Sequence, residues 1–80
     1  MTPKLHWFYL TESGALALVA YPSQISKTPW PWMGHIFTRC VQWDVGWGEH
    51  GEAYFPSFDL AQPLFPASHL FKKLNPPPNT

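Results

Sequence analysis

The chain is poor in charged residues and in cysteine, and both shortages narrow what it can be. Only 12% of its 80 residues are charged, and the formal net charge is zero. Nothing in this composition attracts a phosphate backbone, so we expect no nucleic-acid partner. A single cysteine, Cys40, cannot form an internal disulfide. A disulfide-stapled secreted scaffold is therefore excluded.

Long apolar runs are also missing. No stretch approaches the roughly 18 apolar residues that a membrane-spanning helix needs, so we expect no membrane partner. Near the N-terminus, the polar residues 11–14 (TESG) interrupt the apolar sequence. This interruption defeats the continuous apolar core of a signal peptide. We therefore expect a soluble protein in a reducing, cytoplasmic compartment.

Sequence signatures of catalysis and of metal binding are missing as well. The four histidines and Cys40 show no close ligand spacing of the H-x-x-x-H or C-x-x-C kind. No G-x-S-x-G segment and no phosphate-binding glycine loop is present. Asp44 and Glu52 are the carboxylate pair that a hairpin would bring together, but hairpin loops often carry such charges for solubility. We predict no catalytic residues, no metal and no cofactor, and we favour a protein that is not an enzyme.

Aromatic residues and proline are what the chain has in abundance. Aromatic residues make up 18% of it, and it contains ten prolines and five glycines. A few large aromatic side chains are enough for the core of one small domain, while frequent proline and glycine leave no room for a long helix. We predict an all-β domain over residues 1–74, followed by a proline-rich tail over residues 75–80. The neutral, aromatic-rich surface also favours a homo-oligomer.

Apolar runs bounded by turn residues locate the predicted strands. Residues 5–10 (LHWFYL) and 15–21 (ALALVAY) are typical of a hairpin whose connection contains TESG. The prolines of residues 22–31 predict an irregular connection. Residues 33–45 then predict the longest strand. After a glycine-rich loop, residues 52–60 predict its return strand, interrupted at Pro56.

The segment 63–74 (PLFPASHLFKKL) is expected to close the sheet. Its first apolar pair ends a strand, and Pro66 begins a single 3-10 turn over residues 66–69. Residues 70–74 then form a short final strand, with Lys72 and Lys73 facing water.

This final segment resembles the end of Src-homology-3-like (SH3-like) small barrels. In those domains an apolar pair, a proline, a small pair and an aromatic residue precede a short basic strand. Residues 64–74 (LFPASHLFKKL) are similar in pattern, with His69 at the aromatic position. The resemblance implies a partly open SH3-like barrel of about five strands with one 3-10 turn. It also implies that Pro66 belongs to a groove that docks proline.

A second family on the same fold, the plasmid-borne type II dihydrofolate reductases, has a similar layout. Its members run through a Gly-x-Ile element, a glycine-containing hairpin, an apolar-aromatic-proline segment and a closing strand. Gly34-His35-Ile36 and Leu64-Phe65-Pro66 resemble the first and third of these. Those enzymes use a Gln-Ile-Tyr triplet at a tetramer pore, where this chain has Pro63, Leu64 and Phe65. The resemblance implies, as an alternative, an oligomeric small-molecule binder or enzyme with its site at a shared pore.

Aromatic residues beside the loops are the candidate ligand-binding residues. Trp30 and Trp32 lie in a stiff Pro-Trp-Pro-Trp segment, which loses little entropy when it stacks on a ligand. Their alternative role is to plug an open end of the barrel. Trp43, Trp47, Tyr54 and Phe55 flank the glycine-rich loop, where they would frame a groove for polyproline ligands. Cross-strand packing is the alternative for this second group.

Together these features predict a small protein- or peptide-binding module without catalysis. Its ligand-binding residues are predicted to be Trp30, Trp32, Trp47, Tyr54 and Pro66, and its partner a protein or proline-rich peptide. The composition of the tail suggests that it docks on a neighbouring copy by the same contacts. A phage or mobile-element protein that blocks one host partner is a further alternative, which the small size fits.

Overall fold

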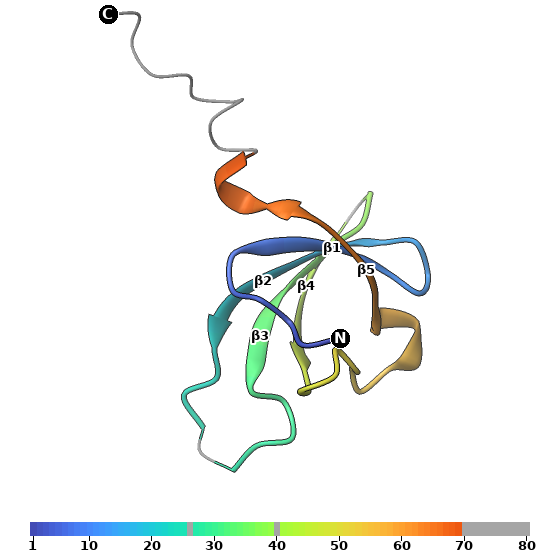
Figure 1. The fold of residues 1–80 in the computed structure, drawn as a ribbon. Helices are drawn as coiled ribbons and strands as arrows, with labels where there is room; N and C mark the ends of the chain where they lie inside the picture. The colour runs from blue at the N-terminus through green and yellow to red at the C-terminus, as the bar shows by residue number, and fades with distance from the viewer. Residues whose placement is uncertain (26, 40, 70–80) are drawn as a thin grey trace, which may run out of the picture.

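Five antiparallel strands form one sheet in the computed structural model, which describes residues 1–25, 27–39 and 41–69 (Figure 1). The strands are β1 (Trp7–Thr11), β2 (Leu16–Pro22), β3 (Trp32–Phe37), β4 (Gln42–Trp47) and β5 (Leu60–Pro66), and the 3-10 helix η1 (Pro56–Phe58) precedes β5. Their order across the sheet is β4-β3-β2-β1-β5. The first four strands form a meander, and β5 returns to pair with β1. The sheet is not closed, so the predicted all-β, partly open architecture is confirmed.

The β1–β2 hairpin lies where the sequence predicts it. Thr11 organises its turn: the Thr11 N–H donates to the Ala15 carbonyl at 2.9 Å, and the Ala15 N–H donates back to Thr11 Oγ1 at 3.0 Å. Gly14 takes a φ of 83°, a left-handed value that glycine adopts without strain. Because Thr11 is buried, its hydroxyl and backbone hold the turn against the body of the sheet.

The prediction of one long strand over residues 33–45 is wrong, because this segment is the β3–β4 hairpin. The chain reverses between Thr38 and Val41. Thr38 Oγ1 donates to the Val41 carbonyl at 2.8 Å, and the Thr38 N–H reaches the same carbonyl at 3.0 Å. Arg39 is exposed in this turn, and Cys40 lies outside the described residues. A threonine side chain can stabilise a turn that contains no glycine or proline.

The predicted return strand over residues 52–60 is also wrong. Among residues 52–59, only Ala53 pairs with the sheet, as a single bridge to Trp47. The chain then forms η1, and Leu60 begins β5. The 3-10 turn therefore lies at Pro56–Phe58 and not over residues 66–69, where it was predicted. Pro56 favours this position because it occupies the first turn of the helix, where its missing N–H removes no hydrogen bond.

The last strand among the described residues is β5, which contains Leu64 and Phe65, the apolar pair expected to end a strand before the turn. Residues 67–69 have helical backbone geometry up to the last described position. The final strand predicted over residues 70–74 and the tail over residues 75–80 lie outside the described residues, so the domain boundary at residue 74 stays a prediction.

The core lies on one face of the sheet. Tyr9, Ala17 and Ile36 stand side by side on β1, β2 and β3 and are almost fully buried. Trp47 and Leu60 complete this cluster from β4 and β5. Within the described ranges, no helix has the length and hydrophobicity that crossing a membrane requires.

Candidate binding groove

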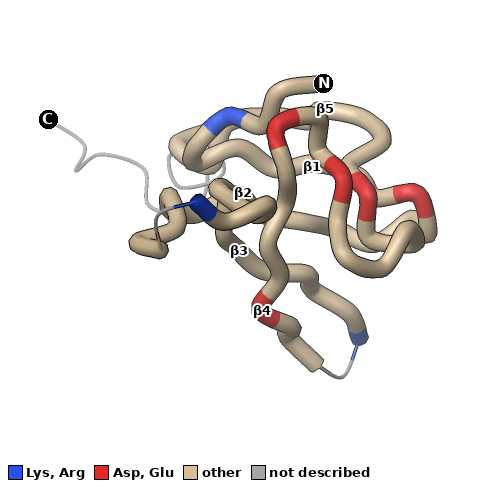
Figure 2. Tube along the Cα trace, turned by 90° about the horizontal axis from the view of Figure 1, so that it is seen from below, with Lys and Arg blue, Asp and Glu red and all other residues tan. Residues whose placement is uncertain are grey.

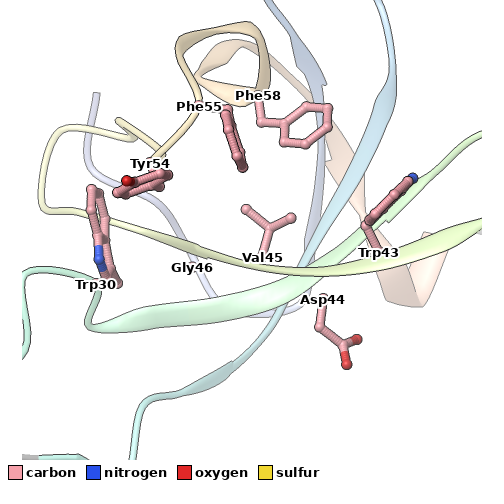
Figure 3. Close-up of a pocket in the computed structure, with 8 residues that line it drawn as sticks. All are labelled: Trp30, Trp43, Asp44, Val45, Gly46, Tyr54, Phe55 and Phe58. Carbon is pink, nitrogen blue, oxygen red and sulfur yellow. The ribbon is translucent and has the colours of Figure 1, made fainter.

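An aromatic groove lies between β4 and the segment that leads into β5. Its cavity has a volume of about 180 Å³. Figure 3 shows β4 as the floor, aromatic rings from the 54–58 segment above it, and one tryptophan at each end. The lining residues are Trp30, Trp43, Asp44, Val45, Gly46, Tyr54, Phe55 and Phe58.

The floor of the groove is made by the C-terminal half of β4. Val45 points its side chain into the groove, whereas the Asp44 carboxylate points to the opposite face of the sheet (Figure 3). There Asp44 Oδ1 lies 2.9 Å from Nδ1 of His35, its partner across the β3–β4 ladder. Gly46 allows Trp30 to approach, because a Cβ at this position would lie 2.8 Å from Trp30 Cβ. The absence of a side chain at Gly46 therefore positions the tryptophan at this end.

One wall of the groove is a continuous series of aromatic contacts. The rings of Trp30 and Tyr54 are 6.5 Å apart at 76°. Those of Tyr54 and Phe55 are 5.1 Å apart at 85°, and those of Phe55 and Phe58 are 6.3 Å apart at 80°. Such edge-to-face pairs are favoured by the ring quadrupole. The exposed rings therefore stabilise one another in a fixed, ridged surface.

A second cavity continues the groove past Trp43. It has a volume of about 320 Å³ and is lined by Trp43, Phe55, Ser57 and Phe58. Trp43, Phe55 and Phe58 belong to both cavities. The two cavities thus adjoin, and these three side chains lie where they meet. Trp43 is 51% exposed, so this part of the groove is open to solvent.

Hydrogen bonds hold the aromatic wall to the rest of the fold. The Trp47 indole N–H donates to the Phe58 carbonyl at 2.9 Å, and Trp47 itself is fully buried. The Ala53 N–H donates to Asp59 Oδ1 at 2.7 Å. The Ser13 N–H donates to the Ser57 carbonyl at 3.0 Å, which joins the β1–β2 turn to η1. These bonds fix the wall against β4, the 52–53 loop and the β1–β2 turn.

Hydrogen-bond donors border the groove on its β4 side. The Thr38–Val41 contact sets which backbone groups of the hairpin face the partner strand. By the alternation of antiparallel ladders, the N–H and C=O of Asp44 then point away from β3, toward the open edge of the sheet. Among the hydrogen bonds between described residues, none uses the Trp30 indole, the Trp43 indole or the Tyr54 hydroxyl. These three groups and the Asp44 N–H are available to a ligand.

Acidic residues adjoin the segment that forms the aromatic wall of the groove. Figure 2 shows most Asp and Glu positions around the end of the molecule where the β1–β2 turn, η1 and the loop after β4 meet, with the described Lys and Arg positions elsewhere. The Glu12 N–H donates to the Asp59 carbonyl at 2.9 Å, and the Gly48 N–H donates to the Glu52 carbonyl at 2.8 Å. Asp59 directly follows Phe58, and Glu52 lies two residues before Tyr54. Carboxylates therefore flank the 54–58 wall of the groove on both sides in the sequence.

The five residues predicted to bind a ligand fall into different surroundings. Trp30 and Tyr54 meet in the groove. Trp47 is fully buried beneath it, and Trp32 is partly buried against the core. Pro66 lies at the other end of β5, opposite Trp7. Ligand binding by these residues stays a prediction, but only the first pair shares a cavity.

Phe58 is the aromatic groove residue that the sequence interpretation missed, although residues 54–58 (YFPSF) place three aromatic residues around a proline. Trp43 and Phe55 were expected beside the glycine-rich loop of an aromatic groove, but they were not among the five residues predicted to bind a ligand. Trp43 was placed near the end of the predicted strand 33–45, with cross-strand packing as its alternative role. No three His, Cys, Asp or Glu side chains gather as a metal site would require within residues 1–25, 27–39 and 41–69.

Comparison with known proteins gives no indication of function, so the groove is the main evidence for it. No family model matches the chain, and no curated protein or solved structure shows significant similarity to it. What the structure does show is a small five-stranded antiparallel sheet with one 3-10 helix among the described residues, compatible with a small β-barrel-like fold.

Proposed function

We propose that the chain is a binding module whose aromatic groove holds an extended, proline-containing peptide segment. The observation that carries this proposal is the series of perpendicular aromatic rings from Trp30 to Phe58. Tyr54 and Phe55 in this series are 75% and 60% exposed. Clustered apolar groups exposed to this degree mark interaction sites, because covering them with a ligand removes apolar area from water.

The shape of the groove favours an extended ligand over a globular one. The two cavities share Trp43, Phe55 and Phe58 and adjoin one another. Rings that stand edge to face leave ridges and hollows along them. A polyproline helix presents alternating ring and carbonyl positions and is ordered before it binds, so its binding sacrifices little conformational entropy.

The polar groups beside the groove support the same ligand class. Proline has no N–H, so a proline-rich segment offers carbonyl acceptors almost alone. The Trp30 and Trp43 indoles, the Tyr54 hydroxyl and the Asp44 N–H are all donors to such carbonyls. These donors therefore match a ligand that offers mainly carbonyl oxygens.

Classification as an SH3-like domain belongs to this proposal. The resemblance implies the order strand, strand, strand hairpin, 3-10 turn and final strand. The chain has β1, β2, the β3–β4 hairpin, η1 and β5 in that order, which supports the classification. The residues that carry the elements differ from those expected, since η1 is formed by residues 56–58 and the last described strand by residues 60–66.

Calorimetric titration of the full chain with a synthetic decaproline peptide tests the proposal. We expect binding that disappears when Trp43 is replaced by alanine. Tyr21→Ala is the matched control, because Tyr21 is an exposed aromatic residue on β2 outside the groove. Loss of at least about tenfold in affinity, or about 1.4 kcal/mol, is expected only for Trp43→Ala. Equal binding by both variants would show that the groove is not the site.

A further inference from the structure

We infer that the natural occupant of the aromatic groove is the C-terminal segment 72–78 (KKLNPPP) of a second copy of the chain. This inference rests on the proposed function, because it uses the same groove. It also names the ligand, and it implies that the protein associates with itself. Three independent features favour this occupant: its residue types, its charge and the place where it leaves the fold.

The residue types of the segment match the groove. Pro76, Pro77 and Pro78 are consecutive. A triproline has no backbone N–H, and it prefers the extended polyproline conformation. The groove next to β4 presents aromatic rings and hydrogen-bond donors, which are the groups that such a segment needs. The chain therefore carries both halves of one recognition system.

The charges of the two parts are opposite. Counting side chains with histidine neutral, the described residues carry five acidic and three basic groups, a net charge of −2. The remaining two lysines, Lys72 and Lys73, give residues 70–80 a net charge of +2. Glu52 and Asp59 flank the 54–58 segment of the groove in the sequence, and Figure 2 shows most acidic positions at one end of the molecule. Attraction between these parts favours docking at low salt.

The point where the tail leaves the fold favours a second copy over the same chain. His69 packs on Phe65 at 5.8 Å, and the Ala67 N–H donates to the His6 carbonyl at 2.6 Å. These contacts hold the last described residue beyond the Pro66 end of β5. The groove lies near the opposite, Leu60 end, because η1 directly precedes this strand.

The reach of the tail makes docking within one chain unfavourable. β5 is seven residues long, so about 20 Å separates its ends. The seven steps from His69 to Pro76 span at most about 25 Å when fully extended. Intramolecular docking would require an immediate reversal and then an almost fully extended path along β5. A tail that crosses to a second copy has no such constraint.

Two copies can exchange their tails reciprocally. Each copy then supplies one groove and one tail, and the dimer contains two identical contacts. Once the first tail has docked, the second contact forms within the complex, at a raised effective concentration. We therefore expect a dimer whose stability depends on both the prolines and the groove.

Sedimentation of full-length chains over a range of protein concentration tests the inference. We expect the wild-type mass to rise from monomer to dimer. Both the Pro76→Ser, Pro77→Ser, Pro78→Ser triple variant and Trp43→Ala should remain monomers. A mixture of these two variants should associate again, because one supplies an intact tail and the other an intact groove. The wild-type association should also weaken by about tenfold or more when salt is raised to several hundred millimolar.

Two results would overturn the inference. One is a wild-type mass that equals that of the triple serine variant at every concentration. The other is a dimer that survives both substitutions, which would place its interface elsewhere. Titration of the triple serine variant with decaproline separates these failures from failure of the proposed function. If the triple serine variant binds decaproline while the wild-type chain stays monomeric, the groove is still a peptide-binding site. Its ligand is then a different molecule and not the tail of a second copy.

Discussion

The Trp47 indole N–H donates a hydrogen bond of 2.9 Å to the backbone carbonyl of Phe58. This contact joins the buried end of β4 to η1, directly beneath the aromatic groove. Trp47 contributes its ring to the core and its polar edge to the wall of the groove. The stability of the fold and the shape of the groove therefore depend on the same side chain.

Replacement of Trp47 by phenylalanine is expected to destabilise the protein strongly. The substitution removes the donor to the Phe58 carbonyl and leaves unfilled space in the core. The free energy of unfolding should fall by about 2–4 kcal/mol. Urea denaturation measures this change. Trp43→Phe is the control, because Trp43 is half exposed. It should change stability by no more than about 0.5 kcal/mol, and equal effects of the two variants would contradict the assigned roles.

Substitution of Gly46 by alanine is expected to damage the groove. The new Cβ would lie 2.8 Å from Trp30 Cβ and 3.0 Å from Met33 Sδ, so Trp30 must move. Overpacking of this kind lowers stability by about 1–3 kcal/mol. Displacement of Trp30 should also reduce decaproline affinity by about tenfold, measured by calorimetry. Unchanged affinity in a folded Gly46→Ala protein would mean that Trp30 makes no contact with the ligand.

The Asp59 carboxylate is expected to support the loop that leads into the groove. Asp59→Ala removes the acceptor of the Ala53 N–H, and an unpaired buried N–H destabilises a protein by about 1–3 kcal/mol. Asp59→Asn keeps an acceptor oxygen and should have a smaller effect. Thermal unfolding of both variants gives the comparison. Equal destabilisation by asparagine and by alanine would contradict the role assigned to the Asp59 carboxylate oxygen.

Gly34 and Gly14 are expected to differ in their tolerance of alanine. A Cβ at Gly34 would lie 1.8 Å from the Leu18 carbonyl oxygen, a backbone atom that cannot move away alone. Gly14 has open space around it and only its φ of 83° opposes a side chain. Gly14→Ala should destabilise by about 1 kcal/mol, and Gly34→Ala by clearly more. Chemical denaturation that ranks them in the reverse order would contradict the close packing of β2 on β3.

The sequence was sufficient for the fold class but not for every turn. Apolar runs and punctuating residues located the β1–β2 hairpin, because Gly14 marks a turn unambiguously. The β3–β4 turn carried no such mark. Thr38 closes it through its hydroxyl, and period-two alternation continues on both sides of the turn. The alternation of residue types alone therefore predicted one strand where the structure has two.

The candidate site was predicted only in part for a related reason. Trp43 and Trp47 are four residues apart on the same face of β4, yet one is 51% exposed and the other 0%. Their difference comes from residues 53–58, which cover the second and leave the first open. Burial by residues that are distant in the sequence does not show in local periodicity. Trp30 and Tyr54 were predicted as binding residues because prolines flank Trp30 and a glycine-rich loop precedes Tyr54.

The most direct test of the peptide-binding groove follows the tryptophan indole N–H resonances during a decaproline titration by nuclear magnetic resonance. The full chain contains five tryptophans. The account predicts that the Trp30 and Trp43 resonances shift progressively, while the buried Trp47 resonance moves little. Shifts confined to Trp7 or Trp32, or no shift at saturating peptide, would contradict it.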